Sequence, residues 1–341
     1  MSGAYRALGL ALGQPPIALA ETLELAKEAE EAGFGMLGVG DLLADSFTLV
    51  GALAARTERA ELFTCVAGWT RTPVSTALSS TTATELSGGR FRLGLGAMPQ
   101  AWSEEWHGVD YAQPVERMRE FVGAVRAALG SSFDSPTSFA GERYSFRNYV
   151  RFSPEPADPV PIYLGATRPA MTKLAGELAD GVLANAVHSV AWLRDVQVPA
   201  LEAGLAAAGR PRGDVDVSVL VICAIDEDVK RARQLARQAI SVYFVAPYFG
   251  DLLRHHGLTR EFEDGARAAS VGDQEAATAA VSDELVELMA VCGSAAEVRG
   301  KLARYEGLAD WLMLSPPIGG SSAVVREQTE RIIATLGPAA G

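Results

Sequence analysis

The sequence has few cysteines and no long apolar run. Its three cysteines, Cys65, Cys223 and Cys292, stand far apart along 341 residues and form no Cys-x-x-Cys pair. Neither a disulfide framework nor a zinc site is therefore indicated. No apolar segment approaches the roughly 18 residues that a membrane-spanning helix needs, and the short apolar run near the amino terminus is better explained as a strand than as a signal peptide. We expect a cytoplasmic protein without a metal or a membrane partner.

An excess of basic residues is also lacking. The chain has 30 Lys and Arg against 42 Asp and Glu, a formal net charge of −12. Binding to a phosphate backbone requires a basic surface, so nucleic acid is not expected as a partner. The hydrophobic fraction of 48% is ample for the core of one large domain or of two ordinary ones.

Short apolar runs alternate with amphipathic helical stretches along the chain. The runs are nearly continuously apolar, which is typical of parallel strands buried on both faces. Eight such units predict a single (β/α)8 TIM barrel over 1–341, with a doubly wound sheet in two domains as the alternative. Predicted strands are 5–12, 36–40, 60–68, 90–96, 160–166, 180–186, 214–225 and 309–316, and predicted helices include 17–33, 47–57, 73–87, 114–129 and 169–178.

Two segments interrupt this rhythm. Residues 131–158 are rich in Ser, Pro and aromatic residues, and residues 247–292 are expected to add helices before the last strand. Insertions at the carboxyl end of a barrel usually shape its binding site, and we expect both segments there.

A glycine run at the fourth predicted strand nearly matches a dinucleotide-binding fingerprint. Gly94 and Gly96 are followed by Pro99 where the pattern requires its third glycine. A true fingerprint belongs to the first strand–helix unit. We therefore interpret these glycines as positions where a ligand lies close to the end of the strand.

Several side chains follow predicted strands and are candidates for a site at the barrel mouth. The turn at 165–171 ends a strand and begins a helix, so its free N–H groups and Arg168 favour an anion. Asp41 is either a mouth residue or the cap of the next helix. Trp69 is either core or the wall of a planar ligand, and Arg71 is either a surface charge or a contact for an anionic substrate. His188 is a candidate proton donor, because the pKa of histidine suits acid–base chemistry.

Three stretches resemble luciferase-like monooxygenase-class proteins, most closely the branch that uses the deazaflavin coenzyme F420. They are 67–122, which includes "SGGRFRLGLGAMPQAW", 159–183, "PVPIYLGATRPAMTKLAGELADGVL", and 282–317. The resemblance implies a (β/α)8 barrel, often a homodimer, with the deazaflavin across the carboxyl-terminal mouth. Its implied coenzyme contacts are Asp41, Thr64, Cys65, Ala67, Gly96, Ala97, Met98, Ala166, Thr167 and Arg168. It also implies a non-prolyl cis peptide, expected at Thr64–Cys65.

Two departures from the sugar-dehydrogenase branch of this family bear on function. Leu42 stands where that branch has a catalytic histidine, and Pro99 where it has a glutamate. We expect instead an oxidoreductase that moves a hydride between the deazaflavin and a small organic substrate, with reduction of C=C or C=N favoured and His188, Asp41 and Trp69 as catalytic candidates. The alternatives are an FMN-dependent monooxygenase of the same superfamily and a barrel that binds a flavin-like ligand without catalysis.

Overall fold

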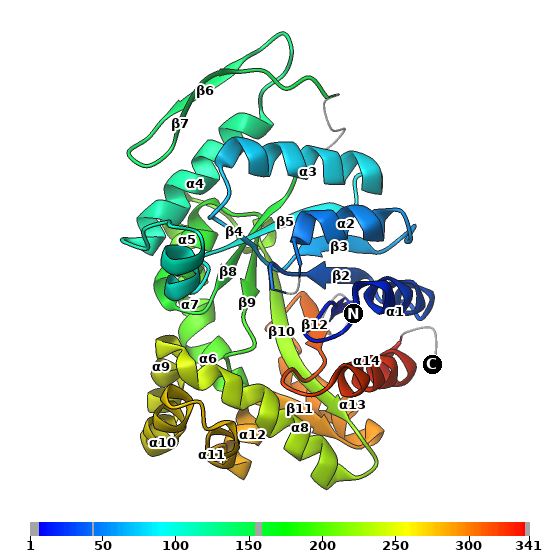
Figure 1. Ribbon diagram of the computed structural model, residues 1–341. Helices are drawn as coiled ribbons and strands as arrows, with labels where there is room; N and C mark the ends of the chain where they lie inside the picture. Colours follow the sequence, from blue (N-terminus) through cyan, green and yellow to red (C-terminus); the bar gives the residue numbers. More distant parts are fainter. Residues whose placement is uncertain (1–6, 43, 154–158, 338–341) are drawn as a thin grey trace.

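The protein is a closed barrel of eight parallel strand positions surrounded by helices (Figure 1). The computed structural model describes residues 7–42, 44–153 and 159–337. The barrel strands, in the order in which they pair, are β1 (Ala7–Ala11), β2 (Met36–Val39), β3 (Glu61–Thr64) with β4 (Ala67–Gly68), β5 (Phe91–Gly96), β8 (Ile162–Ala166), β9 (Gly181–Ala184), β10 (Asp216–Ile225) and β12 (Trp311–Ser315). Pairing of β12 with β1 closes the ring. The barrel prediction is confirmed, and the doubly wound alternative is wrong.

The helices that follow the strands begin and end largely where the sequence predicts. Helix α3 (Pro73–Ser87) begins after Thr72, whose side chain accepts a hydrogen bond from the N–H of Ser75, and ends at Gly88 with a left-handed φ of 64°. Helices α4 (Pro114–Leu129) and α5 (Pro169–Leu178) have the predicted bounds. The other helices of the outer ring are α1 (Leu19–Glu31), α2 (Ser46–Ala54), α6 (Val190–Trp192), α7 (Val198–Ala208), α8 (Val229–Ser241), α13 (Ala295–Leu302) and α14 (Ser322–Leu336).

Strand β10 changes partners along its length. Its first half pairs with β9, from Asp216 to Val219, whereas its second half pairs with β11 (Ala290–Gly293). The sequence predicts helices throughout 247–292, and this prediction is wrong for residues 290–292, which belong to β11. An apolar run of four residues is compatible with a buried helix or a buried strand, so only its pairing with β10 identifies it.

The two interrupting segments have different structures. The earlier one contains an antiparallel hairpin of β6 (Thr137–Ala140) and β7 (Ser145–Tyr149), which projects beyond α3 and α4 (Figure 1); residues 154–158 of this segment lie outside the described residues, as do residues 5 and 6 of the first predicted strand. The later segment contains α9 (Pro247–His255), α10 (Thr259–Ser270), α11 (Gln274–Ala279) and α12 (Asp283–Met289). Helix α9 and its neighbours share a second buried apolar cluster with α8 and β11. Among the described helices, none has the length and apolar character needed to cross a membrane.

Candidate active site at the carboxyl end of the barrel

The strand between the second and third helices is interrupted at the barrel mouth. Strand β3 ends at Thr64 and resumes as β4 at Ala67, and the peptide bond between Cys65 and Val66 is cis. The prediction of a cis bond at Thr64–Cys65 is therefore wrong by one residue. Thr64 still pairs with Val39, and the N–H of Cys65 donates to the carbonyl of Val39, so regular strand geometry continues up to Cys65.

The side chain of Thr64 serves the barrel itself. Its Oγ1 donates to the carbonyl of Gly94 at 3.0 Å and accepts from the N–H of the same residue at 2.9 Å. The side chain is fully buried. Thr64 therefore links β3 to β5 across the bulge, and its hydroxyl is not presented to the mouth.

The glycines of β5 accommodate the protein's own atoms. A Cβ on Gly94 would overlap the carbonyl oxygen of Thr64, and a Cβ on Gly96 would overlap Cγ2 of Val66. A Cβ on Gly165 would also lie 3.0 Å from Cγ1 of Val66. The interpretation that Gly94 and Gly96 leave room for a ligand is thus wrong, because the backbone of β3 occupies the space beside Gly94 and the side chain of Val66 the space beside Gly96.

Asp41 holds the bulge against the mouth. Its Oδ1 accepts from the N–H of Ser46 at 2.9 Å and its Oδ2 from the N–H of Gly68 at 3.0 Å. Its own N–H donates to the carbonyl of Val66 at 3.1 Å. The cap of α2 is Asp45, so Asp41 acts as a clamp between the end of β2, the start of α2 and the bulge.

The mouth surface next to the bulge is mainly apolar. Cys65, Val66 and Ala97 are partly exposed there, whereas Ala67, Gly96 and Met98 are buried. The side chain of Met98 folds over Gly68. Burial raises the pKa of the Cys65 thiol from its ordinary 9.0 to about 12, so this thiol stays protonated near neutral pH.

The turn before α5 places a cation at the start of a helix. Ala166 is buried and Thr167 is partly exposed, while the Arg168 side chain is 55% exposed and no side chain caps the helix. The Nε of Arg168 donates to Oδ2 of Asp251 on α9 at 3.0 Å. Asp251 also pairs with Arg254, so the insertion helix supplies a carboxylate to the candidate anion site.

Two tyrosines of this region were not identified from the sequence. Tyr111 follows β5 and Tyr248 lies on α9; burial raises the pKa of both phenols, and the charge of Arg168 partly counteracts this effect in each case. Both hydroxyls are therefore protonated near neutral pH and lie within electrostatic range of Arg168. Tyr111 lies in the long loop between β5 and α4 and Tyr248 in the later interrupting segment, and the sequence carries no signal that the two reach the same place.

Trp69 and Arg71 are held by protein contacts. Trp69 is only 1% exposed, and its Nε1 donates to Oγ of Ser103 at 3.3 Å. It is therefore a core residue, which contradicts the prediction that it forms the wall of a ligand site. Arg71 pairs with Asp45 at 2.6 Å and lies 4.9 Å from the ring centroid of Phe47, so its charge is already matched.

His188 lies in the interior and does not face the mouth. Its ring is fully buried, with Nδ1 2.7 Å from the carbonyl oxygen of Asn185 and Nε2 3.2 Å from the hydroxyl of Tyr305. Burial lowers the pKa of His188 from 6.5 to about 4. Both ring nitrogens are hydrogen-bonded within the protein. The prediction that His188 faces the mouth as a proton donor is therefore wrong. The position after β9 suggested the mouth, but the chain turns and directs the ring toward Tyr305.

Asn185, directly after β9, has a polar atom without a partner. Its Oδ1 is buried and has no hydrogen-bond donor in the described part of the chain. Buried acceptors are normally satisfied, so this oxygen is suited to an N–H donor of a bound molecule.

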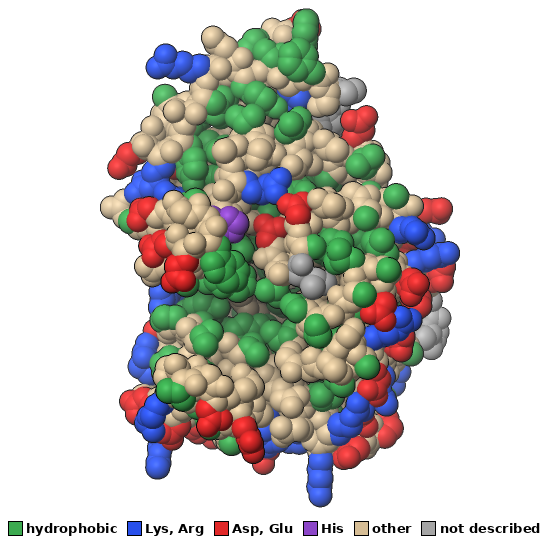
Figure 2. All heavy atoms as spheres, viewed as in Figure 1, with side chains coloured by type: hydrophobic (Ala, Val, Ile, Leu, Met, Phe, Trp, Pro, Cys, Tyr) green, Lys and Arg blue, Asp and Glu red, His purple; other side chains and the backbone are tan. Residues whose placement is uncertain are grey.

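The surface of the molecule is hollowed in the region of the helices that surround these mouth residues. Figure 2 shows a hollow near the middle of this face, lined in view mainly by hydrophobic side chains, with acidic and basic side chains along its upper edge. In the same view, α2 and α5 lie above this region and α6 and α9 below it (Figure 1). The arrangement suits a largely apolar ligand with charged groups at one end.

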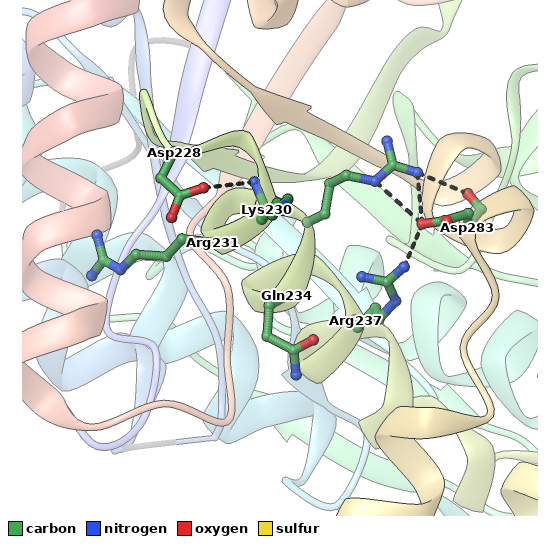
Figure 3. Close-up of a pocket in the computed structure, with 7 residues that line it drawn as sticks. Asp228, Lys230, Arg231, Gln234, Arg237 and Asp283 are labelled. Carbon is green, nitrogen blue, oxygen red and sulfur yellow. Dashed lines mark hydrogen bonds and ion pairs between the residues drawn. The ribbon is translucent and has the colours of Figure 1, made fainter.

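A separate pocket of about 610 Å³ lies along α8 (Figure 3). Its three arginines are ion-paired: Arg231 with Asp226 and Glu327, and Arg233 and Arg237 with Asp283. The three arginines of this pocket are therefore matched by the protein's own carboxylates.

Comparison with known proteins identifies relatives over most of the chain. The sequence profile of the family described as luciferase-like monooxygenase matches residues 5–310. A 5,10-methylenetetrahydromethanopterin reductase of Methanolobus tindarius is 32% identical over 286 residues, which cover 81% of this chain and 84% of the relative. A protein of Mycobacterium tuberculosis, named as a candidate coenzyme F420-dependent oxidoreductase, is 29% identical and covers 94% of this chain and 97% of its own.

A solved structure has the same fold. The coenzyme F420-dependent tetrahydromethanopterin reductase of Methanopyrus kandleri superimposes with a TM-score of 0.84 at 24% identity, over 98% of both chains.

Proposed function

Because the chain belongs to the luciferase-like monooxygenase family, we propose that it is an oxidoreductase that uses coenzyme F420. It would transfer a hydride between the deazaflavin and a small organic substrate, with reduction of a C=C or C=N bond favoured. The names of the reductase and oxidoreductase relatives support this class. One observation carries the proposal: a partly exposed apolar bulge and the start of α5, with Arg168, lie at the same end of the barrel.

The residues at the bulge fit a planar ring with a polar edge. Val66 and Ala97 offer apolar surface, and the unpartnered Oδ1 of Asn185 offers an acceptor for a ring N–H. Coenzyme F420, when bound, supplies the hydride chemistry, and the protein supplies position and exclusion of water. Asp41 would maintain the position of the bulge through its two backbone hydrogen bonds.

The anionic tail of the coenzyme would bind at the start of α5. Arg168 and the N–H groups near Thr167 form a positive end at a helix of ten residues, a common setting for phosphate. FMN also carries a phosphate, so this feature alone does not select between the two cofactors.

Protonated groups at the mouth can supply a proton to the reduced substrate. The phenols of Tyr111 and Tyr248 and the thiol of Cys65 all have raised pKa values caused by burial, so each keeps its proton near neutral pH. We place the proton donor among these groups in preference to His188, whose ring is engaged on both sides.

The class of reaction can be tested with two assays on the purified protein. Under anaerobic conditions, reduced F420 is supplied with a panel of activated alkenes and imines, and return of the visible absorbance of the oxidised coenzyme is followed. In parallel, oxygen consumption is measured with reduced FMN and the same compounds. We expect F420 oxidation that depends on the added compound. Compound-dependent oxygen uptake with FMN alone would instead identify a monooxygenase.

A further inference from the structure

Arg117, in the first turns of α4, is a buried cation. Its side chain is only 9% exposed, and its Nε is buried and has no hydrogen-bond partner among the residues that the structure describes. Within the described ranges, no carboxylate or carbonyl oxygen pairs with its guanidinium. The neighbouring arginines of α4 differ, since Arg119 pairs with Glu177 and Arg126 pairs with Asp180.

The acidic residue one turn further along α4 is already occupied. Oε1 of Glu120 accepts from the backbone N–H groups of Arg143 and Tyr144, both at 2.7 Å, and Oε2 lies 3.9 Å from the guanidinium of Arg143. Glu120 therefore orders the hairpin, and in the described part of the chain it makes no ion pair with Arg117. A buried charge is unfavourable unless it is paired, so a partner from outside the chain is indicated.

Aromatic rings hold the guanidinium in place. Its Cζ lies 5.6 Å from the ring centroid of Trp69 and 5.8 Å from that of Tyr144. The hydroxyl of Tyr144 is itself buried and has no hydrogen-bond partner in the described ranges, and burial raises the pKa of this phenol, so it remains a donor. The guanidinium of Arg117 and the phenol of Tyr144 thus lie side by side, and each has a hydrogen-bond donor without a partner among the described residues.

This contact adjoins the barrel mouth. Trp69 directly follows β4, and the ring of Tyr111 packs edge-on against it at 5.4 Å. The positive charge of Arg168 in turn acts on Tyr111 and opposes the rise in the pKa of its phenol. Arg117 is therefore placed on the side of the mouth that faces the hairpin.

We propose that Arg117, with Tyr144, forms an anion subsite that binds a carboxylate or phosphate group of a small molecule held at the mouth. A planar guanidinium can donate two parallel hydrogen bonds to either group, and the flanking rings restrict its orientation. Arg71, the other candidate for an anionic substrate, is matched by Asp45, whereas no ion pair of Arg117 is found among the described residues. The identification of the anion as part of a substrate rests on the proposed function, whereas anion binding does not.

The subsite can be tested on the protein without cofactor. Acetate and inorganic phosphate are titrated separately, at ionic strength held constant with sodium chloride, and thermal unfolding and tryptophan fluorescence are recorded. We expect saturable stabilisation of the wild-type protein by at least one anion. Arg117→Met, which keeps the length of the side chain, should weaken the apparent affinity at least tenfold, and Arg117→Lys should weaken it less.

Arg119→Met is the matched control, because it removes one charge from the same helix. It should leave the response unchanged. A preference for acetate would indicate a carboxylate ligand, and a preference for phosphate a phosphorylated one. The same saturation in wild-type and Arg117→Met proteins, or no response beyond that to chloride, would overturn the subsite. Because F420 is absent, neither result depends on the proposed function.

Discussion

Arg168 is the residue at which recognition of the coenzyme tail can be separated from recognition of the ring. It stands at the start of α5, and its side chain is more than half exposed. A hydrogen bond to a charged group contributes roughly 1.5–3 kcal/mol. We expect the lower end of that range here, because Arg168 is exposed and already pairs with Asp251.

Arg168→Ala should therefore weaken F420 binding about tenfold, which corresponds to about 1.4 kcal/mol, and leave hydride transfer at saturating coenzyme nearly unchanged. Dissociation constants are measured for F420 and for a deazaflavin without the phosphate tail. Lys173→Ala, an exposed cation on the same helix, is the control. Equal losses for the tailed and the tailless ligand would show that Arg168 supports the fold or the ring instead.

His188 gives a prediction about stability and pH. Its folded-state pKa is lowered by burial to about 4, against 6.5 when unfolded, so between these values the unfolded chain binds a proton that the folded protein does not. Stability should consequently fall as the pH drops below about 6.5, by up to about 1.4 kcal/mol per pH unit from this group. Above that pH the residue makes no pH-dependent contribution.

His188→Gln keeps hydrogen-bonding groups near Asn185 and Tyr305 but does not titrate. The free energy of unfolding of both proteins is measured with urea between pH 4 and pH 7, about the window in which histidine titrates. It should fall less steeply with decreasing pH for the variant than for the wild type. Parallel slopes would mean that His188 is accessible to protons in the folded state.

At the scale of elements, the bulge after β3 depends on β5. Gly96→Ala would drive its Cβ into Val66, and overpacking of this kind costs about 1–3 kcal/mol of unfolding free energy. Gly300→Ala is the control, since a Cβ on Gly300 in α13 meets nothing within 4 Å and should be neutral or stabilising.

The second substitution Val66→Ala should recover part of the loss, and denaturant unfolding of the single and double variants measures the coupling. Additive effects of the two changes would contradict direct packing of Gly96 against Val66.

The insertion helix α9 and helix α5 are joined by Arg168 and Asp251, which are 83 residues apart in sequence. Asp251 competes with an anionic ligand for Arg168. Asp251→Asn should therefore tighten F420 binding two- to threefold, about 0.5 kcal/mol, a magnitude typical of an exposed ion pair.

Asp264→Asn removes an acidic charge from the neighbouring helix α10, where Asp264 pairs with Arg260 and Arg267, and controls for net charge. Equal effects of the two variants on the F420 dissociation constant would show that Asp251 acts only through long-range charge.

At the scale of the whole molecule, the repeat of apolar runs and helices was sufficient to predict the barrel. The bounds of α4 and α5 also followed from local signals such as a proline at the first helical position. The directions of individual side chains could not be predicted from such local signals. Strands buried on both faces lack the alternation that distinguishes the two sides, so the sequence did not reveal that Trp69 and His188 point into the interior.

The remaining site residues depend on contacts between distant segments. Asp251 and Tyr248 on α9, Tyr111 after β5 and Arg117 on α4 could not be recognised from the sequence, because only the closed barrel brings them to one end. The association into a homodimer stays a prediction.

The most direct test of the F420 proposal is an equilibrium titration of the protein with oxidised F420, FMN and NADPH, followed by tryptophan fluorescence. We predict saturable binding of F420 and binding of FMN that is weaker by about tenfold or more, which corresponds to about 1.4 kcal/mol. We predict no response to NADPH, because the glycine run at β5 packs against the bulge at Val66 and does not form a dinucleotide-binding turn. Tight binding of FMN or NADPH without a response to F420 would contradict the proposed function.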